Sequence, residues 1–329
     1  MQEQAPNHQP SVFLSCPPDE IQVSVIIPAF NASATIGRAL DSVRAQEGVG
    51  AEIIVIDDAS SDGTAQAVRD AIRPGENITL LQLPVNSGVS AARNAGIRLA
   101  RAPYLAFLDA DDAWLPGKLR RQVAVIGADP AITLVSCNSQ QADAEGRPLK
   151  EGHVNRPPVQ GPDAWKTLLM YNFLPTPTVL TRTALVRELG GFDEQLAVGE
   201  DLDLWIKLAT RGKIAVLPEV LICYYDLSNS LMKRHGRQTS IIVTPMIERH
   251  MREQGARLDD AEIRHMRGSR SFQTGCDLFF SGSYRASIPP FIMAVRCGTR
   301  PFKSLSYLPR ALMMEAAMLT RRAFARADK

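Results

Sequence analysis

The sequence predicts an α/β fold in which a mostly parallel central sheet is flanked by helices, with a helical appendage at the C-terminal end. Short runs of consecutive apolar residues alternate with segments whose apolar residues recur every three or four positions. Such apolar runs are typical of parallel strands covered on both faces, and the wider spacing is typical of amphipathic helices. After Ser230 the character changes to helical patterns with more basic residues and methionines.

The elements follow in order along the chain. The predicted strands cover residues 23–28, 52–56, 78–83, 104–108, 132–137 and 221–225. The predicted helices between them cover residues 33–46, 63–72, 88–100, 115–126, 163–171, 183–189 and 201–211. Residues 143–162 are rich in glycine, proline and charge, which predicts a loop. Further helices are expected over residues 241–254, 261–269 and 308–326.

These patterns divide the chain into a disordered tail over residues 1–21, an α/β domain over residues 22–232 and a basic helical region over residues 233–329. The net charge of +2 hides an asymmetry, because residues 233–329 contain 18 Lys and Arg against 8 Asp and Glu. The usual nucleic-acid-binding signatures are absent, so we expect no nucleic-acid partner. An anionic membrane surface or an anionic acceptor is the expected partner; alternatively, the last helix only packs on the α/β domain.

Composition indicates the compartment. The five cysteines are odd in number and lack metal-ligand spacing, so we expect reduced thiols in the cytoplasm. Residues 1–21 lack the basic start and apolar core of a secretory signal. The sequence has no apolar run near the ~20 residues that a spanning helix needs, which leaves peripheral association with the inner face of the membrane.

Acidic residues follow two of the predicted strands. The run YLAFLDADD at residues 104–112 ends in three carboxylates, Asp109, Asp111 and Asp112. Carboxylates this close repel one another and stay ionised together only near a positive charge, which a divalent cation supplies well. An isolated acidic turn that caps a helix is the simpler interpretation. The other segments argue against it, because Asn31, Asp57 and Asp58 also follow predicted parallel strands and would gather at the same edge.

Five segments together resemble a known family. They read VSVIIPAFN at residues 23–31, VIDDASSDGT at residues 55–64, NSGVSAARNAG at residues 86–96, LDADD at residues 108–112, and GGFD at residues 190–193 with GEDLDLW at residues 199–205. In this order they are similar to the inverting, nucleotide-sugar-dependent glycosyltransferases of family 2, which have the GT-A fold. The resemblance covers about residues 22–226.

The resemblance implies a site for a nucleotide-diphosphate sugar. Pro28 and Ala29 would line the base pocket through their backbone, Asp58 would bind the base, and Arg93 would contact the nucleotide. An ion pair between Arg93 and a neighbouring aspartate is the alternative. The remaining residues assigned to the nucleotide are Asn31, Gly88, Asp109 and Ala110.

The same resemblance makes Asp111, with Asp109, the ligand of Mn²⁺ or Mg²⁺, which would bridge the two phosphates. The third ligand is undetermined, because residues 224–230 read YYDLSNS where many relatives carry an arginine or a histidine.

The segment GEDLDLW supplies the expected catalytic base. Asp201 beside Glu200 is the candidate, since one of two adjacent carboxylates can stay ionised and take a proton from the acceptor hydroxyl. Alternatively, both acids only favour the positive end of a helix. Trp205, one turn after Asp201, is expected to offer an aromatic wall to the acceptor sugar.

The expected function is metal-dependent, inverting transfer of a single sugar from a UDP-linked donor to a glycan or lipid-linked acceptor of a surface polysaccharide. The processive-synthase signature QxxRW is absent, which favours one sugar per cycle. Two alternatives stay open, a nucleotidyltransferase and a catalytically silent nucleotide-sugar-binding protein.

Overall fold

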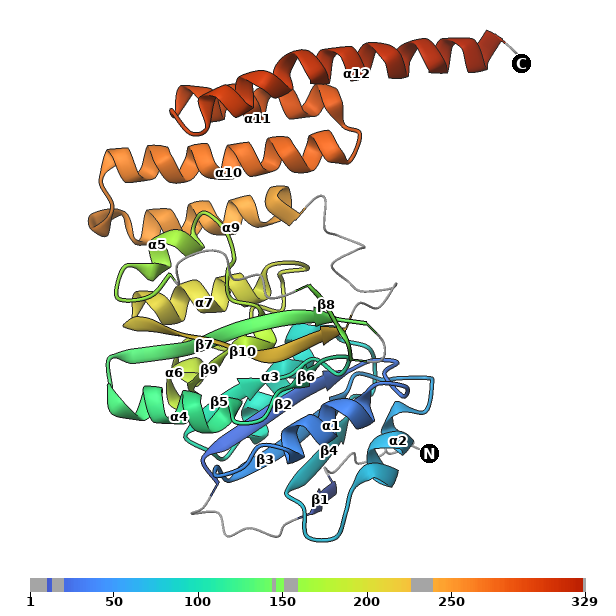
Figure 1. Ribbon diagram of the computed structural model, residues 1–329, viewed down its shortest axis with the longest axis vertical. Helices are drawn as coiled ribbons and strands as arrows, with labels where there is room; N and C mark the ends of the chain where they lie inside the picture. The colour runs from blue at the N-terminus through green and yellow to red at the C-terminus, as the bar shows by residue number, and fades with distance from the viewer. Residues whose placement is uncertain (1–10, 14–20, 144–145, 151–158, 226–238, 328–329) are drawn as a thin grey trace, which may run out of the picture. The chain divides into compact units, whose positions relative to one another are not determined.

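The structure is a computed structural model that describes residues 11–13, 21–143, 146–150, 159–225 and 239–327. The chain forms two compact units (Figure 1). The α/β unit comprises Met1–Trp165 and Phe173–Leu227, and the helical unit comprises Lys166–Asn172 and Ser228–Lys329. The boundary expected at residues 232–233 lies outside the described residues.

Ten strands among the described residues form one sheet in the order β1-β4-β3-β2-β5-β9-β7-β10-β6, with β8 paired to β7. They are β1 (Ser11–Phe13), β2 (Val23–Ala29), β3 (Ala51–Asp57), β4 (Ile78–Gln82), β5 (Tyr104–Phe107), β6 (Ala113–Trp114), β7 (Ile132–Ala142), β8 (Pro148–Lys150), β9 (Leu180–Arg182) and β10 (Lys213–Tyr225). Strands β4, β3, β2 and β5 are parallel, as predicted. The sheet is nevertheless mixed, because β9 lies antiparallel between β5 and β7.

The sequence prediction differs from the structure at short or interrupted strands. Strand β1 pairs with β4 within the tail expected to be disordered, while residues 1–10 and 14–20 lie outside the described part of the chain. Strands β6 and β9 are too short to give an apolar run. Strand β10 begins at Lys213, well before the expected start of residue 221. Its register with β7 shifts between Leu217 and Ile222, where Pro218 and Glu219 interrupt the apolar pattern.

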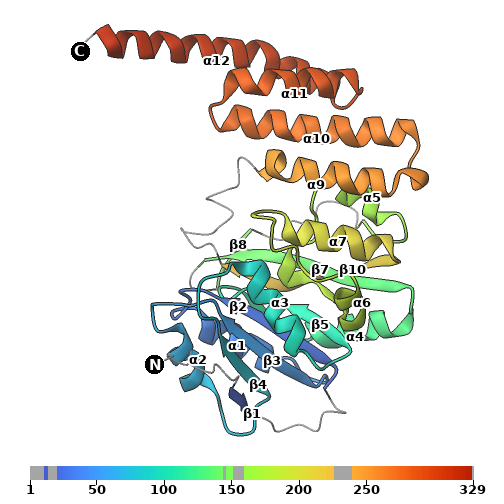
Figure 2. The same ribbon diagram turned by 180° about the vertical axis from the view of Figure 1, so that it is seen from behind.

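Helices cover both faces of the sheet. In the α/β unit they are α1 (Ile36–Arg44), α2 (Thr64–Ala71), α3 (Val89–Leu99), α4 (Lys118–Ala128), α6 (Thr183–Glu188) and α7 (Glu200–Thr210); α5 (Ala164–Leu168) and the 3₁₀ turn η2 (Thr176–Thr178) lie between β8 and β9 in sequence. Helices α1, α2 and α4 share one apolar cluster with β2 and β3 (Figure 1). Helix α3 packs on the opposite face (Figure 2), where a Cβ at Gly96 would lie 2.6 Å from Ile26 Cγ2. Glycine therefore sets the close approach of α3 to β2.

The helical unit contains α9 (Thr239–Glu253), the 3₁₀ turn η3 (Gly255–Arg257), α10 (Asp260–Phe280), α11 (Tyr284–Arg296) and α12 (Pro301–Ala327). Helices α10, α11 and α12 pack side by side in that order (Figures 1 and 2). The Phe291 and Tyr307 rings stack with centroids 4.8 Å apart and join α11 to α12. Helix α11 was not predicted, because Pro289 and Pro290 read as helix breakers, yet the helix contains both. Among the described residues, no helix combines the length and the apolar character needed to cross a bilayer.

Candidate active site

The parallel strands β2, β3 and β5 end at one edge of the sheet, and the predicted polar residues follow them there. Asn31 comes after β2, Asp58 after β3 and Asp109 after β5. The strand registers bring Ala29 beside Asp57 and Ile26 beside Phe107, so the segments that follow are neighbours. This confirms the expected gathering of these segments at the carboxyl edge.

Asp58 anchors the segment that leads into α3. Its carboxylate accepts hydrogen bonds from the Ser87 and Gly88 backbone N–H groups at 2.7 and 2.8 Å, and its own N–H donates to the Ala29 carbonyl at 2.8 Å. Gly88 has φ +88°, a conformation that glycine adopts without strain. Asp58 is buried, and its carboxylate already accepts from two backbone donors. Pro28, near the end of β2, is half-buried. The contact of Asp58 with a base stays a prediction.

The loops after β2 and β3 are tied to each other. Asn31, with φ 50°, accepts a hydrogen bond from the Ser61 N–H at 3.0 Å through Oδ1. Asp62 accepts from the Ser33 N–H at 2.9 Å and from Thr64. Burial works to raise the pKa of Asp62, but the hydrogen bonds from Thr64 and Ser33 outweigh it and lower the pKa to about 2. Sequence reasoning assigned no role to Asp62, although its place just before the start of α2 signals a capping residue.

Arg93 on α3 joins two acidic segments. Its Nη2 donates to Asp109 Oδ1 at 2.9 Å, and its Nη1 donates to Glu200 Oε1 at 3.0 Å. The guanidinium also lies over the Phe192 ring, 5.2 Å from the centroid. Burial works to lower the pKa of Arg93, but the charges of Asp109, Glu200 and Asp201 outweigh it and raise the pKa. The ion-pair alternative for Arg93 is therefore confirmed, and a direct contact with nucleotide stays a prediction.

The neighbouring Asn94 has a positioning role that sequence reasoning missed. Its side chain donates to the Phe192 carbonyl and accepts from the Phe192 N–H at 2.8 and 2.9 Å, and it also donates to Glu194 at 2.8 Å. A Cβ at Gly191 would lie 2.5 Å from Asn94 Oδ1. The sequence signal was the pair of motifs NSGVSAARNAG and GGFD, which the fold brings together here.

The acids after β5 carry excess negative charge. Burial, followed by the negative charge of Asp109, raises the pKa of Asp111. Burial also raises the pKa of Asp112 well above its usual range, with further contributions from Asp109 and Asp111. Between these acids, Ala110 is buried. The group of acids is therefore poorly neutralised by the protein alone.

Arg38 on α1 partly offsets that charge, and sequence reasoning missed it. Its Nη2 donates to the Asp111 carbonyl at 2.7 Å, and its guanidinium lies 3.5 Å from the centroid of the Tyr225 ring. Its charge acts to lower the pKa of both Asp111 and Asp112. Arg38 thereby fixes the backbone of the acidic turn.

The acidic turn has the chemistry of a site for a hard divalent cation. Asp109 and Asp111 offer carboxylate oxygens, and because burial and the charge of Asp109 raise the pKa of Asp111, a positive charge nearby would favour its ionised form. Within the described ranges, no three Asp, Glu, His or Cys side chains form a metal-binding group. Of the stretch 224–230, on which the third ligand was left undetermined, residues 226–230 lie outside the described residues.

Glu200 and Asp201 are the first residues of α7, after Gly199 at φ 83°. Glu200 is held by Arg93, whereas the half-buried Asp201 accepts from Thr176 Oγ1 at 3.4 Å and from the Leu202 N–H at 2.7 Å. The two adjacent acids therefore have different partners, and Asp201 remains accessible.

The assignment of Trp205 to an acceptor site is wrong. Its side chain is 0% exposed. The ring packs against Phe107 and Phe192, with centroids 6.0 Å away in each case. Trp205 does lie one turn after Asp201, as expected. It is on the buried face of α7, however, so its side chain lies in the core. Trp205 therefore supports the Phe192 ring on which Arg93 lies and cannot touch a sugar.

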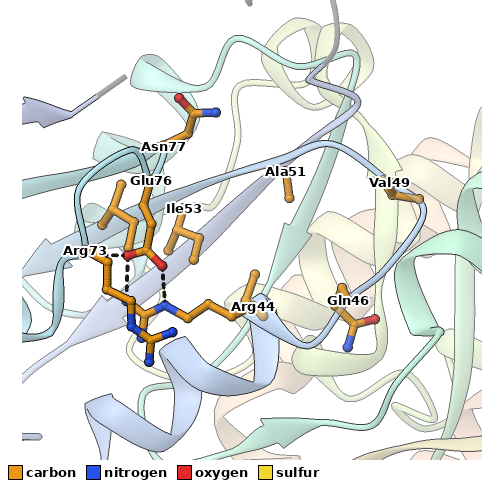
Figure 3. A pocket seen from close by; sticks show the side chains of 10 residues that line it. Arg44, Gln46, Val49, Ala51, Ile53, Arg73, Glu76 and Asn77 are labelled. Carbon is orange, nitrogen blue, oxygen red and sulfur yellow. Dashed lines mark hydrogen bonds and ion pairs between the residues drawn. The ribbon is translucent and has the colours of Figure 1, made fainter. Parts of the chain in front are cut away.

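A surface pocket lies at the other end of the sheet (Figure 3). It includes Ala51 and Ile78, the first residues of β3 and β4. Arg44 and Glu76 pair with each other in this pocket, since Arg44 Nε donates to Glu76 Oε1 at 2.6 Å, and Glu76 also accepts from the Arg73 backbone N–H. This pocket is separate from the acidic edge and adds no group to it.

Comparison with known proteins identifies the family. The family model described as "Glycosyl transferase family 2" matches residues 24–187. The amylovoran biosynthesis glycosyltransferase AmsB of Erwinia amylovora is 31% identical over 230 residues, which cover 67% of this chain and 73% of AmsB. The chain belongs to glycosyltransferase family 2. The matched residues include Asn31, Asp58 and the acids after β5, whereas Glu200 and Asp201 lie beyond them.

Other relatives agree on the family and the fold. The succinoglycan biosynthesis protein ExoO of Rhizobium meliloti is 34% identical over 220 residues, covering 64% of this chain but only 62% of ExoO. Residues 1–349 of TarS from S. aureus superpose with a TM-score of 0.61 at 19% identity, covering 90% of this chain and 87% of that one. The mannosyltransferase PcManGT of Pyrobaculum calidifontis, solved with GDP-Man and Mn²⁺, superposes with a TM-score of 0.56 at 19% identity. The match covers 93% of this chain and 89% of PcManGT. These likenesses confirm the GT-A fold.

Proposed function

We propose that this protein transfers a single sugar from a UDP-sugar to a glycan or lipid-linked acceptor during synthesis of a surface polysaccharide. The observation that carries the proposal is Arg93, which joins Asp109 of the donor segment to Glu200 beside the candidate base. The names of ExoO and AmsB support the polysaccharide pathway, and TarS structures with UDP and UDP-GlcNAc support the donor class.

The donor would lie along the carboxyl edge. Asp58, held in place by its bonds to the segment before α3, would direct its remaining acceptor capacity to an N–H of the base. Asn31, Gly88 and the backbone of Pro28 and Ala29 would form the walls of the base pocket. Asp109, one-third exposed beside Arg93, would face the ribose.

A bound Mn²⁺ or Mg²⁺ would stabilise the negative charge that develops on the diphosphate as the sugar leaves. Asp111 and Asp109 would hold this ion. Arg38 donates a hydrogen bond to the Asp111 carbonyl at 2.7 Å and would hold this backbone in place, which would position the Asp111 carboxylate for the ion.

The transfer itself would be a single displacement. The acceptor hydroxyl oxygen forms the new bond to the anomeric carbon, the bond from that carbon to the diphosphate oxygen breaks, and the hydroxyl proton passes to Asp201. Attack from the face opposite the leaving group inverts the anomeric configuration. Glu200 is occupied by Arg93, which leaves Asp201 as the base, and Thr176 orients its carboxylate.

We place this activity at the cytoplasmic face of the membrane, where a lipid-linked acceptor is available. The charge of residues 285–329, with 9 Lys and Arg against 2 Asp and Glu, supports this location. Each basic residue near an anionic surface contributes on the order of 1 kcal/mol.

The test compares the wild-type chain with Asp111→Ala. We expect the wild type to release UDP from one member of a panel of UDP-sugars when Mn²⁺ and acceptor are present. Asp111→Ala should abolish transfer and weaken UDP binding in calorimetry, because the ion loses its protein anchor.

Asp129→Ala is the matched control, because Asp129 is a half-exposed aspartate that pairs with Lys213 at 3.1 Å, away from the acidic edge. It should behave as wild type. Metal-independent binding and turnover in Asp111→Ala would overturn the metal assignment, and nucleotide release from a nucleoside triphosphate instead of a UDP-sugar would overturn the reaction.

A further inference from the structure

Helix α12 exposes a continuous row of apolar side chains, called here the apolar stripe. Its members recur at intervals of three and four residues, so they share one face of the helix: Phe302, Leu305, Pro309, Leu312, Ala316 and Leu319. Phe302 is 87% exposed, Leu312 60% and Leu319 55%. Met313, also exposed, borders the stripe. Scattered exposed apolar residues are ordinary, but a contiguous row indicates a binding surface.

The stripe is not the face by which α12 packs on α11. That face contains Ser304 and Ala311, both fully buried, and Tyr307, which stacks on Phe291. Leu312 lies about 100° around the helix from Ala311, and Phe302 lies further still from Ser304. Helix α12 therefore has two apolar faces, and within the helical unit only one of them is covered.

Basic residues border the stripe. Lys303 and Arg310 are seven residues apart, so they lie in line along one edge of it, and both are exposed. The sequence of α12 contains a single acidic residue, Glu315, against five lysines and arginines. Glu315 accepts a hydrogen bond from the Arg285 N–H at 3.3 Å, so its carboxylate turns toward the start of α11.

We infer that the apolar stripe is the surface by which this protein lies on an anionic lipid bilayer. The apolar side chains enter the boundary between headgroups and acyl chains, while Lys303 and Arg310 bind the anionic headgroups. The inference deepens the membrane location proposed above and does not depend on the sugar-transfer reaction.

Charge decides between a bilayer and a second copy of the chain. Two copies that met along the stripe would place two rows of lysine and arginine near each other, which costs free energy. An anionic bilayer covers the same apolar side chains and attracts the same charges. A free anionic glycan would match the charges but would leave Phe302 and Leu312 in water.

The experiment is co-sedimentation of the full chain with vesicles of phosphatidylglycerol and phosphatidylcholine, without nucleotide or acceptor. The variant Lys303→Gln/Arg310→Gln should bind more weakly by about fivefold for each charge removed. The variant Phe302→Ser/Leu312→Ser should lose on the order of tenfold per residue. Both changes are at exposed positions, so thermal unfolding should stay as in the wild type.

The charge-matched control is Arg257→Gln/Arg264→Gln, which removes two positive charges from η3 and α10 instead of α12. It should bind like the wild type. Pure phosphatidylcholine vesicles should bind the wild type weakly, and added salt should weaken binding to the anionic vesicles.

Several results would overturn the inference. Equal binding by the wild type and both α12 variants would remove the stripe from the interface. A wild-type dimer in light scattering that becomes monomeric in Phe302→Ser/Leu312→Ser would assign the stripe to self-association. Transfer to a water-soluble acceptor should be unchanged in the α12 variants, so loss of membrane binding and loss of activity can be told apart.

Discussion

Two arginines organise the charges of the site at the scale of single residues. Arg93 bonds one acid from the turn after β5 and one from the start of α7, whereas Arg38 bonds the backbone between the acids. The planar fork of a guanidinium is suited to holding two carboxylates on different elements at once. The geometry of donor and base segments therefore depends on one side chain that is 5% exposed.

Arg93→Lys keeps the positive charge but loses the fork. We expect a drop in kcat/KM of about ten- to a hundredfold, because Asp109 and Glu200 can no longer be held together. Steady-state transfer assays measure this drop in kcat/KM. Arg121→Lys is the control, since Arg121 forms an exposed pair with Glu219 at 3.0 Å and should tolerate the change. Wild-type kinetics in Arg93→Lys would show that the bidentate link is dispensable.

Asp201→Asn tests the base directly. The variant should keep UDP and metal binding and slow the chemical step by about two to four orders of magnitude. Thr176→Val should cause a smaller loss, because it removes only the 3.4 Å hydrogen bond that orients the carboxylate. Pre-steady-state turnover separates binding from chemistry. A normal rate in Asp201→Asn together with a lost rate in Glu200→Gln would move the base to Glu200.

At the scale of elements, the contact between α3 and β2 places Arg93 at the edge. Gly96, one turn after Arg93 on the same helix, lies against Ile26, and the ring of Phe192 supports the guanidinium from the other side. The register of α3 on the sheet thus sets the position of the arginine.

Gly96→Ala should destabilise the α/β unit by about 1–3 kcal/mol, because its Cβ would lie 2.6 Å from Ile26 Cγ2 in a packed core. Gly37→Ala on α1 is the matched control: no atom lies within 4 Å of its Cβ, so the better helix former should stabilise by about 0.5–1 kcal/mol. Urea unfolding followed by tryptophan fluorescence reports on this unit, which contains Trp114, Trp165 and Trp205. Opposite signs for the two variants are the expected result.

At the scale of the whole molecule, stability should respond to pH with two opposite signs. The pKa of Asp62 falls from 3.8 to about 2 on folding, so its contribution is present above pH 3.8 and disappears as the pH falls toward 2. Asp111 and Asp112 have pKa values raised above 3.8, so the folded state binds more protons there. Their ionisation costs stability as the pH rises above 3.8.

A divalent cation should relieve that cost at pH values where the carboxyls are ionised and repel one another. We expect Mn²⁺ with UDP to raise the Tm at neutral pH, and the increase should shrink toward pH 4, because protonated Asp111 cannot bind the ion. Differential scanning calorimetry measures this, with Asp111→Ala as the control that should not respond. An increase in Tm of the same size at pH 4 and pH 7 would contradict it.

Much of the fold could be predicted because its signals are local. The apolar runs of β2, β3, β4 and β5 and the spacing of α1, α2 and α3 are visible within single windows of sequence. Strands β1, β6, β8 and β9, the third of them inside the segment predicted as a loop, were not predicted because two or three residues are too few to show a period. Helix α11 escaped because its prolines argue locally against a helix, while burial of Phe291 and Ala294 favours it.

The sequence by itself determined which acids follow which strands, since an apolar strand that stops on carboxylates must deliver them to an edge. Only the tertiary structure decided what those acids contact. Arg93 and Glu200 are 107 residues apart, and no local period connects them. Trp205 was placed one turn from Asp201 correctly, yet its exposure depended on Phe107 and Phe192. Spacing fixes direction within one helix, whereas burial depends on the elements that pack against it.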